Sequence, residues 1–402
     1  MSNPLFLTVS LLLAMAPAAP GEWLQFRGPN ASSRGAGQPP AALSATDIVW
    51  KTALPGRGLS SPVIAGNNIF VTAASGPDQE TLHVLCFDNT NGQKRWERRF
   101  LATGRTMCHE KTNVAAPTPA SDGTRVFALF SSNDCFALDF DGNLLWLRGL
   151  TLDYPNASNS LGLASSPIMA GGVLITQIEN DGDSFTAGLD PATGANLWKI
   201  ARPKVANWTS PTTWQDPTDG RTLVLVTSDE GVIALDPKTG KEQWTLPKPG
   251  TTIASSAIGE KHLAVPRAGK GLAVWSLPGG TTPPALLWES AQVNTGTASP
   301  LIYGSQVFTI NGAGVLTCAD LATGDRPWKV RLEGPFSASP ILASTTLYAV
   351  SERGLLQSID TTSAEGTITG KLDLGTPILG TPSLSGNSLF VRSDGHLWKI
   401  GK

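Results

Sequence analysis

Charged side chains are scarce in this chain, cysteines are few, and a long apolar run is missing beyond the first residues. Asp, Glu, Lys and Arg make up 15% of the 402 residues and the net charge is −2, so no basic surface for nucleic acid or an anionic membrane is expected. The one nearly unbroken apolar stretch, LFLTVSLLLAMA (5–16), is too short to cross a bilayer. These absences argue against a nucleic-acid-binding protein and against a transmembrane span.

Four cysteines are too few for a disulfide-stapled domain. Cys86 and Cys318 stand on predicted strands and are expected to be small core residues. Cys108 lies in a loop and Cys135 at the start of a strand, so a bridge between them and two free thiols are both open. The chain has no adjacent Cys-Cys pair and no C-x-x-C-H haem-attachment motif.

The N-terminus has the features of an export signal. The apolar run is followed by small residues at Ala16 and Ala18, which suit a signal peptidase, and this predicts a signal peptide over residues 1–18. No cysteine follows the run, so no lipid anchor is expected. The sequence therefore predicts a periplasmic or secreted protein, expected to be a monomer.

A ten-residue phrase recurs along the chain as LDPATGANLW (189–198), LDPKTGKEQW (235–244) and ADLATGDRPW (319–328). Around it lies a unit of four short predicted strands that occurs eight times. The units open at Pro62, Pro119, Pro167, Pro211, Ala257, Pro300, Pro340 and Pro382. Their mean spacing of about 46 residues is the length of one four-stranded propeller blade.

Each part of the phrase has a structural role. In D-x-x-T-G the Asp side chain accepts hydrogen bonds from turn amides, and the Gly takes a positive φ. A tryptophan follows on the outer strand and is expected to be buried as a wedge between blades. The predicted structural tryptophans are Trp50, Trp96, Trp146, Trp198, Trp244, Trp288 and Trp328. The second and third strands are apolar runs, which indicates burial on both faces.

The two ends of the chain carry complementary half-blades. GHLWKIGK, at the C-terminus, reads as a third strand with no fourth strand after it, and DIVWKTAL (47–54) reads as a fourth strand with no turn before it. We therefore predict an all-β protein, an eight-bladed β-propeller of four-stranded antiparallel blades closed by an N-terminal strand. Its domains are an extended lead-in over 19–46 and one propeller over 47–402, with blade eight made of 376–402 plus 47–54.

The repeat resembles that of the quinoprotein-type propellers, A-x-D-x-x-T-G-x-x-x-W, most clearly as ALDPKTGKEQW (234–244). That group of PQQ-like repeat propellers includes alcohol dehydrogenases holding pyrroloquinoline quinone and Ca²⁺ in the central funnel, and the BamB-type assembly lipoprotein, which has the fold without the cofactor. WLQFRGPNASSRGAG (23–37) and MCHEKTN (107–113) are similar to exported quinoprotein-like repeat proteins of planctomycetes. The resemblance implies the fold and leaves the activity open.

Within that resemblance, the dehydrogenases use adjacent cysteines in a ring disulfide over the quinone and an Asp base. The chain has no such pair, so we expect no cofactor, with pyrroloquinoline quinone and Ca²⁺ as the alternative. No metal is expected either. Cys108, His109 and Glu110 are sequence neighbours that point in different directions, and the D-x-D of IENDGDSF (178–185) lacks the bidentate Glu of a calcium loop.

Two loops hold the candidate binding residues. RTMCHEKTN (105–113) supplies Cys108, His109, Glu110, Lys111 and Asn113 between blades one and two, and ARPKVANWTSP (201–211) supplies Arg202 and Trp208. Either loop can line a pocket at the propeller mouth or only tie blades together, and Arg202 can pair with a neighbouring acid. No catalytic residue is predicted. We expect a non-catalytic module for a protein partner or extended ligand; the alternative is a quinone-dependent dehydrogenase.

Overall fold

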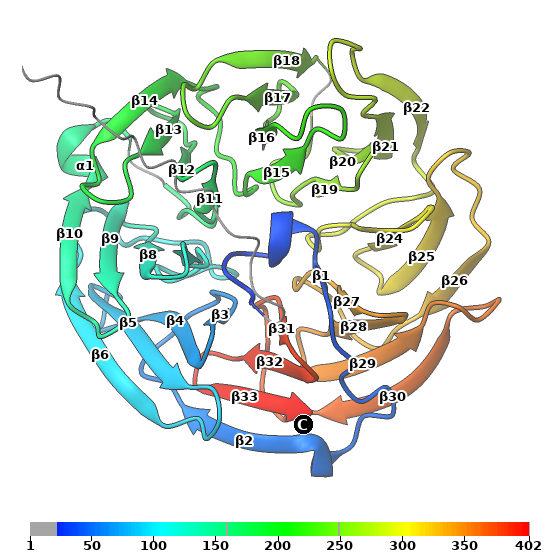
Figure 1. Cartoon of the computed structure of the whole chain (residues 1–402). Coiled ribbons are helices and arrows are strands. Elements are labelled where there is room, and N and C mark those ends of the chain that lie inside the picture. Colours follow the sequence, from blue (N-terminus) through cyan, green and yellow to red (C-terminus); the bar gives the residue numbers. More distant parts are fainter. Residues whose placement is uncertain (1–21, 158–159, 248–249, 402) are drawn as a thin grey trace, which may run out of the picture.

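The computed structural model describes residues 22–157, 160–247 and 250–401, and these form a ring of eight β-sheets around a central channel (Figure 1). Helical structure in this part of the chain is limited to the short α-helix α1 (Leu150–Asp153) and the 3-10 turns η1 (Pro29–Ala31) and η2 (Ala45–Asp47). No helix of the described residues has the length and apolar character that a membrane crossing needs. The predicted signal peptide lies outside these residues.

The blades follow one another in chain order, with the first strand beside the channel and the fourth at the rim. Blade one consists of β3 (Val63–Ala65), β4 (Asn68–Ser75), β5 (Thr81–Asp88) and β6 (Lys94–Leu101), and blade two of β7 (Ala120–Ser121), β8 (Arg125–Leu129), β9 (Asp134–Asp139) and β10 (Leu144–Gly149). Blade three consists of β11 (Ile168–Ala170), β12 (Val173–Ile178), β13 (Phe185–Leu189) and β14 (Asn196–Ala201), and blade four of β15 (Thr212–Gln215), β16 (Thr222–Thr227), β17 (Val232–Leu235) and β18 (Glu242–Leu246).

The second half of the ring repeats this arrangement, except that the last two blades take up N-terminal strands. Blade five consists of β19 (Ala257–Ile258), β20 (His262–Arg267), β21 (Gly271–Ser276) and β22 (Ala285–Ser290), and blade six of β23 (Leu301–Tyr303), β24 (Gln306–Ile310), β25 (Val315–Asp320) and β26 (Trp328–Arg331). Blade seven consists of β27 (Ile341–Ala343), β28 (Thr346–Val350), β29 (Leu355–Asp360) and β30 (Thr367–Asp373), with β1 (Arg34–Gly35) parallel to β27. Blade eight consists of β31 (Ser383–Ser385), β32 (Ser388–Arg392) and β33 (His396–Gly401), and β2 (Ile48–Ala53) completes it.

The ring closes where the two ends of the chain meet, as predicted. Strand β2 pairs antiparallel with β33, with Ile48 opposite Ile400 and Ala53 opposite His396. Figure 1 shows the blue β2 outside the red β33. The eighth sheet therefore joins residues from both ends of the sequence, and the predicted all-β, eight-bladed architecture is confirmed.

The D-x-x-T-G turn has the predicted geometry. In blade four, the Asp236 carboxylate accepts hydrogen bonds from the amides of Lys238 and Thr239, both at 2.9 Å, and Gly240 has φ +68°. The inner strands are buried on both faces, since every residue of β12 and β13 is buried. Stacked blades therefore form the core, which is split into clusters around the ring.

Six of the structural tryptophans lie against the turn glycine of the next blade. There is no room for a side chain at these glycines, because a Cβ there would fall 2.5–2.9 Å from the indole; the pairs are Trp50 with Gly92, Trp96 with Gly142, Trp146 with Gly194, Trp198 with Gly240, Trp288 with Gly324 and Trp328 with Gly366. Trp146, Trp198 and Trp328 are buried as expected, whereas Trp50, Trp96, Trp244 and Trp288 are only half-buried. All seven belong to fourth strands, which have one side towards solvent, so even the buried three keep 7–9% of their surface exposed.

The lead-in does not stay on the outside of the ring. It crosses the centre of the ring (Figure 1). Trp23, with no exposed surface, exchanges two backbone hydrogen bonds of 2.9 Å with Ile64 of β3. Further along, β1 pairs with β27 through Arg34 opposite Leu342. The N-terminal segment 22–43 thus lies inside the channel and closes one of its ends. This is the end at which the turns between the first and second strands of the blades lie.

Arg27 holds this segment in place from within the channel. Its guanidinium is fully buried, and it donates to Ser33 Oγ at 2.7 Å, to the carbonyl of Ser256 at 2.7 Å and to that of Pro300 at 2.5 Å. Burial lowers the pKa of Arg27 to about 9. One side chain therefore joins the segment to blades five and six.

Candidate functional site

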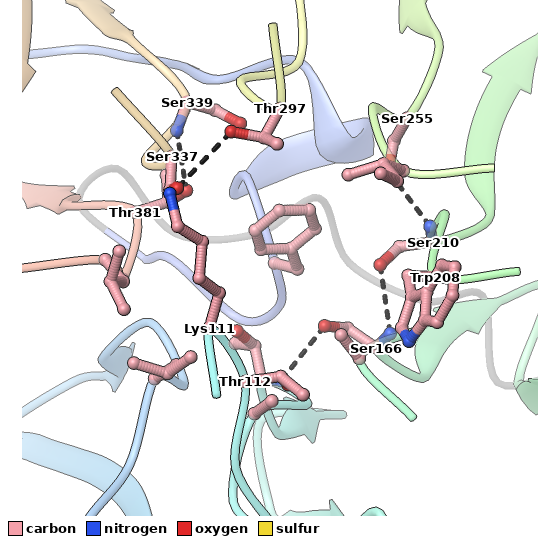
Figure 2. A pocket seen from close by; sticks show the side chains of 18 of the residues that line it. Lys111, Thr112, Ser166, Trp208, Ser210, Ser255, Thr297, Ser337, Ser339 and Thr381 are labelled. Carbon is pink, nitrogen blue, oxygen red and sulfur yellow. Dashed lines mark hydrogen bonds between the residues drawn. The ribbon is translucent and has the colours of Figure 1, made fainter. Parts of the chain in front are cut away.

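A cavity of about 450 Å³ occupies the open end of the channel, on the face formed by the connections between blades (Figure 2). Phe26 lines the cavity at its floor, the end that the N-terminal segment closes, and loops from around the ring form its wall. The cavity is a funnel with one mouth, because segment 22–43 fills the channel beneath it. Its volume lies within the range of small-ligand pockets.

A ring of serine and threonine hydroxyls forms the lower wall of this funnel. At seven of the eight junctions between blades, the residue before the opening position donates its backbone N–H to the hydroxyl oxygen at the same position in the next blade, at 2.8–3.0 Å. The residues are Ser61, Thr118, Ser166, Ser210, Ser255, Ser299, Ser339 and Thr381. Ser61 Oγ has no hydrogen-bond partner among the described residues, so the ring stays open at the junction of blades eight and one.

This hydroxyl ring also corrects the register of blade five. We predicted that the unit opens at Ala257, but Ser255 occupies the ring position, so Ser256 stands where the other blades have proline. The carbonyl of Ser256 and that of Pro300 both accept from Arg27, which agrees with this assignment. The prediction was wrong by one residue because blade five has lost both the proline and the D-x-x-T-G motif.

Apolar side chains cover much of the remaining wall. Leu59, Leu161, Ile253 and Leu379 line the funnel, and Trp208 lies beside them, its Nε1 donating to the carbonyl of Gly162 at 2.7 Å. That bond fixes the indole ring and satisfies its polar atom. Each ring hydroxyl except that of Ser61 accepts one hydrogen bond from a neighbouring amide and keeps its O–H, so the wall offers a ligand apolar surface above a ring of hydroxyl groups.

Lys111 is the one cation in the described lining, and its charge is paired with a carboxylate at the rim. Lys111 Nζ lies 3.3 Å from Glu352 Oε2 of blade seven, and Ser337 Oγ donates to the other carboxylate oxygen at 2.7 Å. The Lys111 side chain is 58% exposed, so this pair is a solvated contact across the mouth rather than a buried charge.

The structure brings together some of the predicted site residues and separates others. His109, Lys111 and Trp208 line the funnel. Arg202 is outside its described lining and pairs instead with the buried Glu179, Nε to Oε1 at 2.7 Å. Burial raises the pKa of Glu179, while the Arg202 charge acts in the opposite direction.

The other three residues of the first loop are not part of the described lining. Glu110 is exposed and Asn113 is buried. Cys108 is half-buried, with Sγ 3.6 Å from Ser131 Oγ, and burial raises the pKa of its thiol. Of the two arrangements left open for Cys108 and Cys135, the structure has two free thiols. Ligand binding by any of the seven candidates stays a prediction.

Sequence reasoning missed Phe26 and the hydroxyl ring. The ring had a visible signal, since Ser or Thr precedes the opening proline in every unit that keeps one. Phe26 had none, because nothing in a Pro- and Gly-rich lead-in shows that it enters the channel.

Pyrroloquinoline quinone with Ca²⁺ does not fit this funnel. Calcium takes six to eight oxygen ligands, carboxylates prominent among them. No Asp or Glu belongs to the described lining, whose side-chain oxygens are all neutral Ser and Thr hydroxyls. In the part of the chain described here, no three His, Cys, Asp or Glu residues gather as metal ligands would. We therefore derive no chemistry through this cofactor, and its absence stays a prediction.

Comparison with known proteins agrees with the fold. Among solved structures, BamB from Moraxella catarrhalis has 17% identity over 88% of this chain and 97% of its own, with a TM-score of 0.64. A europium-containing methanol dehydrogenase has 12% identity over 96% and 98% of the two chains and a TM-score of 0.73. Quinohemoprotein alcohol dehydrogenase from Comamonas testosteroni has 12% identity over 96% and 81%, with a TM-score of 0.72.

Such low identities establish the architecture alone. No protein of curated function has a significant sequence match. The family model for outer membrane protein assembly factor BamB, however, matches residues 40–183 and 181–365, which is most of the chain. The protein therefore belongs to this BamB family of propellers built from PQQ-like repeats.

Proposed function

We propose that this protein is an exported, non-catalytic binding module of the cell envelope, and that a protein partner docks at the mouth of the funnel with an apolar side chain inserted into it. The observation that carries the proposal is the combination of a closed floor, an apolar wall and an exposed apolar rim at one end of the channel. A mouth of this kind suits a protruding part of a folded partner or an extended segment.

Two exposed apolar side chains belong to the funnel wall, and two more lie in the loops that reach it. Leu161 is 43% exposed and Ile253 49%, and both belong to the funnel wall. Met107, 59% exposed, and Val205, 39% exposed, belong to the loops that carry Lys111 and Trp208. Exposed apolar residues clustered at a concave mouth support an interaction surface more than scattered ones do.

The envelope location rests on the predicted signal peptide and on membership of the BamB family. Both support a protein that works outside the cytoplasm. Neither identifies the partner, which we describe only as a protein with an exposed apolar segment.

Site-specific photocrosslinking tests this proposal. A photoreactive amino acid at Ile253 or Met107 is expected to give a discrete adduct in intact envelopes, whereas Leu144 or Leu286, exposed on outer strands, serve as matched controls and give none. Val205→Asp is expected to weaken the Ile253 adduct at least about tenfold, since interface energy concentrates in few apolar contacts. Equal adducts from rim and outer strands, or none from the rim, contradict docking at the mouth.

The dehydrogenase alternative has its own test. Titration of the purified protein with pyrroloquinoline quinone and Ca²⁺ is expected to give no tight complex and no dye-linked alcohol oxidation. A dissociation constant of about 1 μM or lower would replace the binding-module proposal with the enzyme.

A further inference from the structure

The junction between blades four and five departs from the repeat at its outer edge. Five structural tryptophans donate from Nε1 to a carbonyl of the next blade at 2.8–3.2 Å: Trp50, Trp96, Trp146, Trp198 and Trp288. Neither Trp244 of blade four nor Trp328 of blade six makes this bond within the described residues, but Gly366 lies against Trp328, whereas no described glycine closes over Trp244. The reason is that blade five carries LPGGTTPP (277–284) where the D-x-x-T-G turn would be. The half-buried Trp244 is thus left without its usual cover.

A second irregularity lies beside the first. The turn between β15 and β16 of blade four is the long DPTDG (216–220), and Trp214 precedes it. Asp216, 1% exposed, accepts from the amide of Thr218 at 2.9 Å and from the amide of Gly280 at 2.8 Å. Its carboxylate therefore joins the two irregular segments, one from each blade.

Gly279 shows that this contact is close. It has φ +85°, and a Cβ there would lie 2.3 Å from Asp216 Oδ1, so a side chain cannot be accommodated without moving the segment. The insertion is therefore held at a defined position against blade four.

Together these segments enclose a cavity of about 310 Å³. It is separate from the funnel and lies on the opposite face of the ring, because it is built from connections between first and second and between third and fourth strands. Trp214 and Trp244 supply aromatic surface, and Arg221, Gln243, Thr281 and Thr282 supply hydrogen-bonding groups. Trp214 is already satisfied, since its Nε1 donates to the carbonyl of Glu260 at 2.8 Å. Trp244 Nε1 has no acceptor among the described residues.

The charges of the cavity are largely balanced. Arg221, whose side chain is 47% exposed, donates from Nε to Asp219 Oδ2 at 2.5 Å and lies 3.6 Å from Asp216 Oδ2. Its Nη1 donates to Gln243 Oε1 at 3.4 Å, and Gln243 Nε2 donates to the carbonyl of Lys241 at 3.3 Å, so the amide keeps one N–H and one oxygen lone pair for a ligand. A strongly charged ligand therefore gains little here, and a purely apolar one leaves these polar groups unpaired.

We propose that this cavity binds a pyranose ring of a saccharide. A sugar ring combines an apolar C–H surface, which matches an indole, with hydroxyl groups that both donate and accept hydrogen bonds. The indole surface of Trp244 takes the C–H side, while the Trp244 Nε1, the Gln243 amide and the Arg221 guanidinium take the hydroxyls. The volume suits one or two rings.

The test is a titration of the mature protein with maltotriose, cellotriose and N,N′-diacetylchitobiose, followed by calorimetry and tryptophan fluorescence. We expect at least one to bind with a dissociation constant of about 0.1–1 mM, as for a small, open site. Trp244→Ala and Gln243→Ala are each expected to weaken that binding about tenfold or more.

Matched controls come from regular parts of the repeat. Trp96→Ala, at the half-buried tryptophan that contacts Gly142, and Gln306→Ala, on β24, are expected to leave saccharide binding unchanged, with folding checked by circular dichroism. No heat with any of the three saccharides at about 10 mM overturns the proposal. So does binding that survives both Trp244→Ala and Gln243→Ala, or competition by inorganic phosphate, which would identify an anion site at Arg221.

Discussion

The two ends of the central channel are built in opposite ways. At the closed end, segment 22–43 makes hydrogen bonds or bridges to all eight blades, through Ile64, Ser121, Met169, Thr213, Ser256, Pro300, Leu342 and Asn387. At the open end, the first strands satisfy one another through the hydroxyl ring. The closed end thus depends on an added segment, whereas at the open end the blades bond directly at seven of the eight junctions, which leaves that end available to a ligand.

Two buried arginines, Arg27 and Arg392, link neighbouring blades in similar ways. Arg27 belongs to the added segment, whereas Arg392 belongs to β32 and donates to Ser60 Oγ at 3.1 Å and to the carbonyl of Thr72 at 2.8 Å. Burial lowers the pKa of Arg392 to about 10, against the opposing effect of Asp394. Both guanidiniums bind backbone carbonyls, so each acts as a clamp between blades rather than as a ligand group.

The largest effect is expected from Trp23→Ala at the closed end. Trp23 has no exposed surface, and its loss leaves a cavity beside β3, at a cost of about 3–5 kcal/mol in the free energy of unfolding. Leu161→Ala at the open end, where the side chain is 43% exposed, should cost less than about 1 kcal/mol. Urea unfolding followed by circular dichroism measures both. Equal losses would show that the two ends are equally important for stability.

The second-largest loss of stability is expected from Arg27→Met. It leaves the carbonyls of Ser256 and Pro300 without their buried donor, which should cost about 2–4 kcal/mol. The same measurement applies, with Arg353→Met, at an exposed position, as the control expected to change stability by no more than about 0.5 kcal/mol. An Arg27→Met protein as stable as the parent would mean that the clamp is dispensable.

Phe26→Ala bears on the boundary between the two ends. Removing the half-buried floor deepens the funnel, so we expect an apolar fluorescent dye to bind about two- to threefold more strongly, with about 1–2 kcal/mol lost in stability. Phe100→Ala, which truncates a half-buried phenylalanine of β6, should leave dye binding unchanged. Increased dye binding in both variants would indicate general loosening instead of a deeper funnel.

The smallest effect is expected at the rim. A double-mutant cycle of Lys111→Ala and Glu352→Ala should give a coupling energy below about 1 kcal/mol that decreases further in high salt, because the pair is solvated. A larger coupling energy that resists salt would mean that the Lys111–Glu352 pair holds the open end together, as Arg27 does at the closed end.

The sequence predicts the ring well because the repeat marks its own boundaries. D-x-x-T-G and the following Trp set the blade count, and the matching half-blades set the partner of β2. The register failed only in blade five, where those residues are missing. The path of segment 22–43, the funnel floor and the position of Arg202 depend on which distant loops meet after closure, and local patterns carry no information on that.

The pairing of β2 with β33 has a consequence for assembly. Its partners are 343 or more residues apart in the chain, from Ala53 with His396 outwards. Until the last residues emerge, β2 has no partner strand, and the first and seventh blades each have one face without a neighbouring blade. During synthesis the ring therefore cannot close before the C-terminal strand is available.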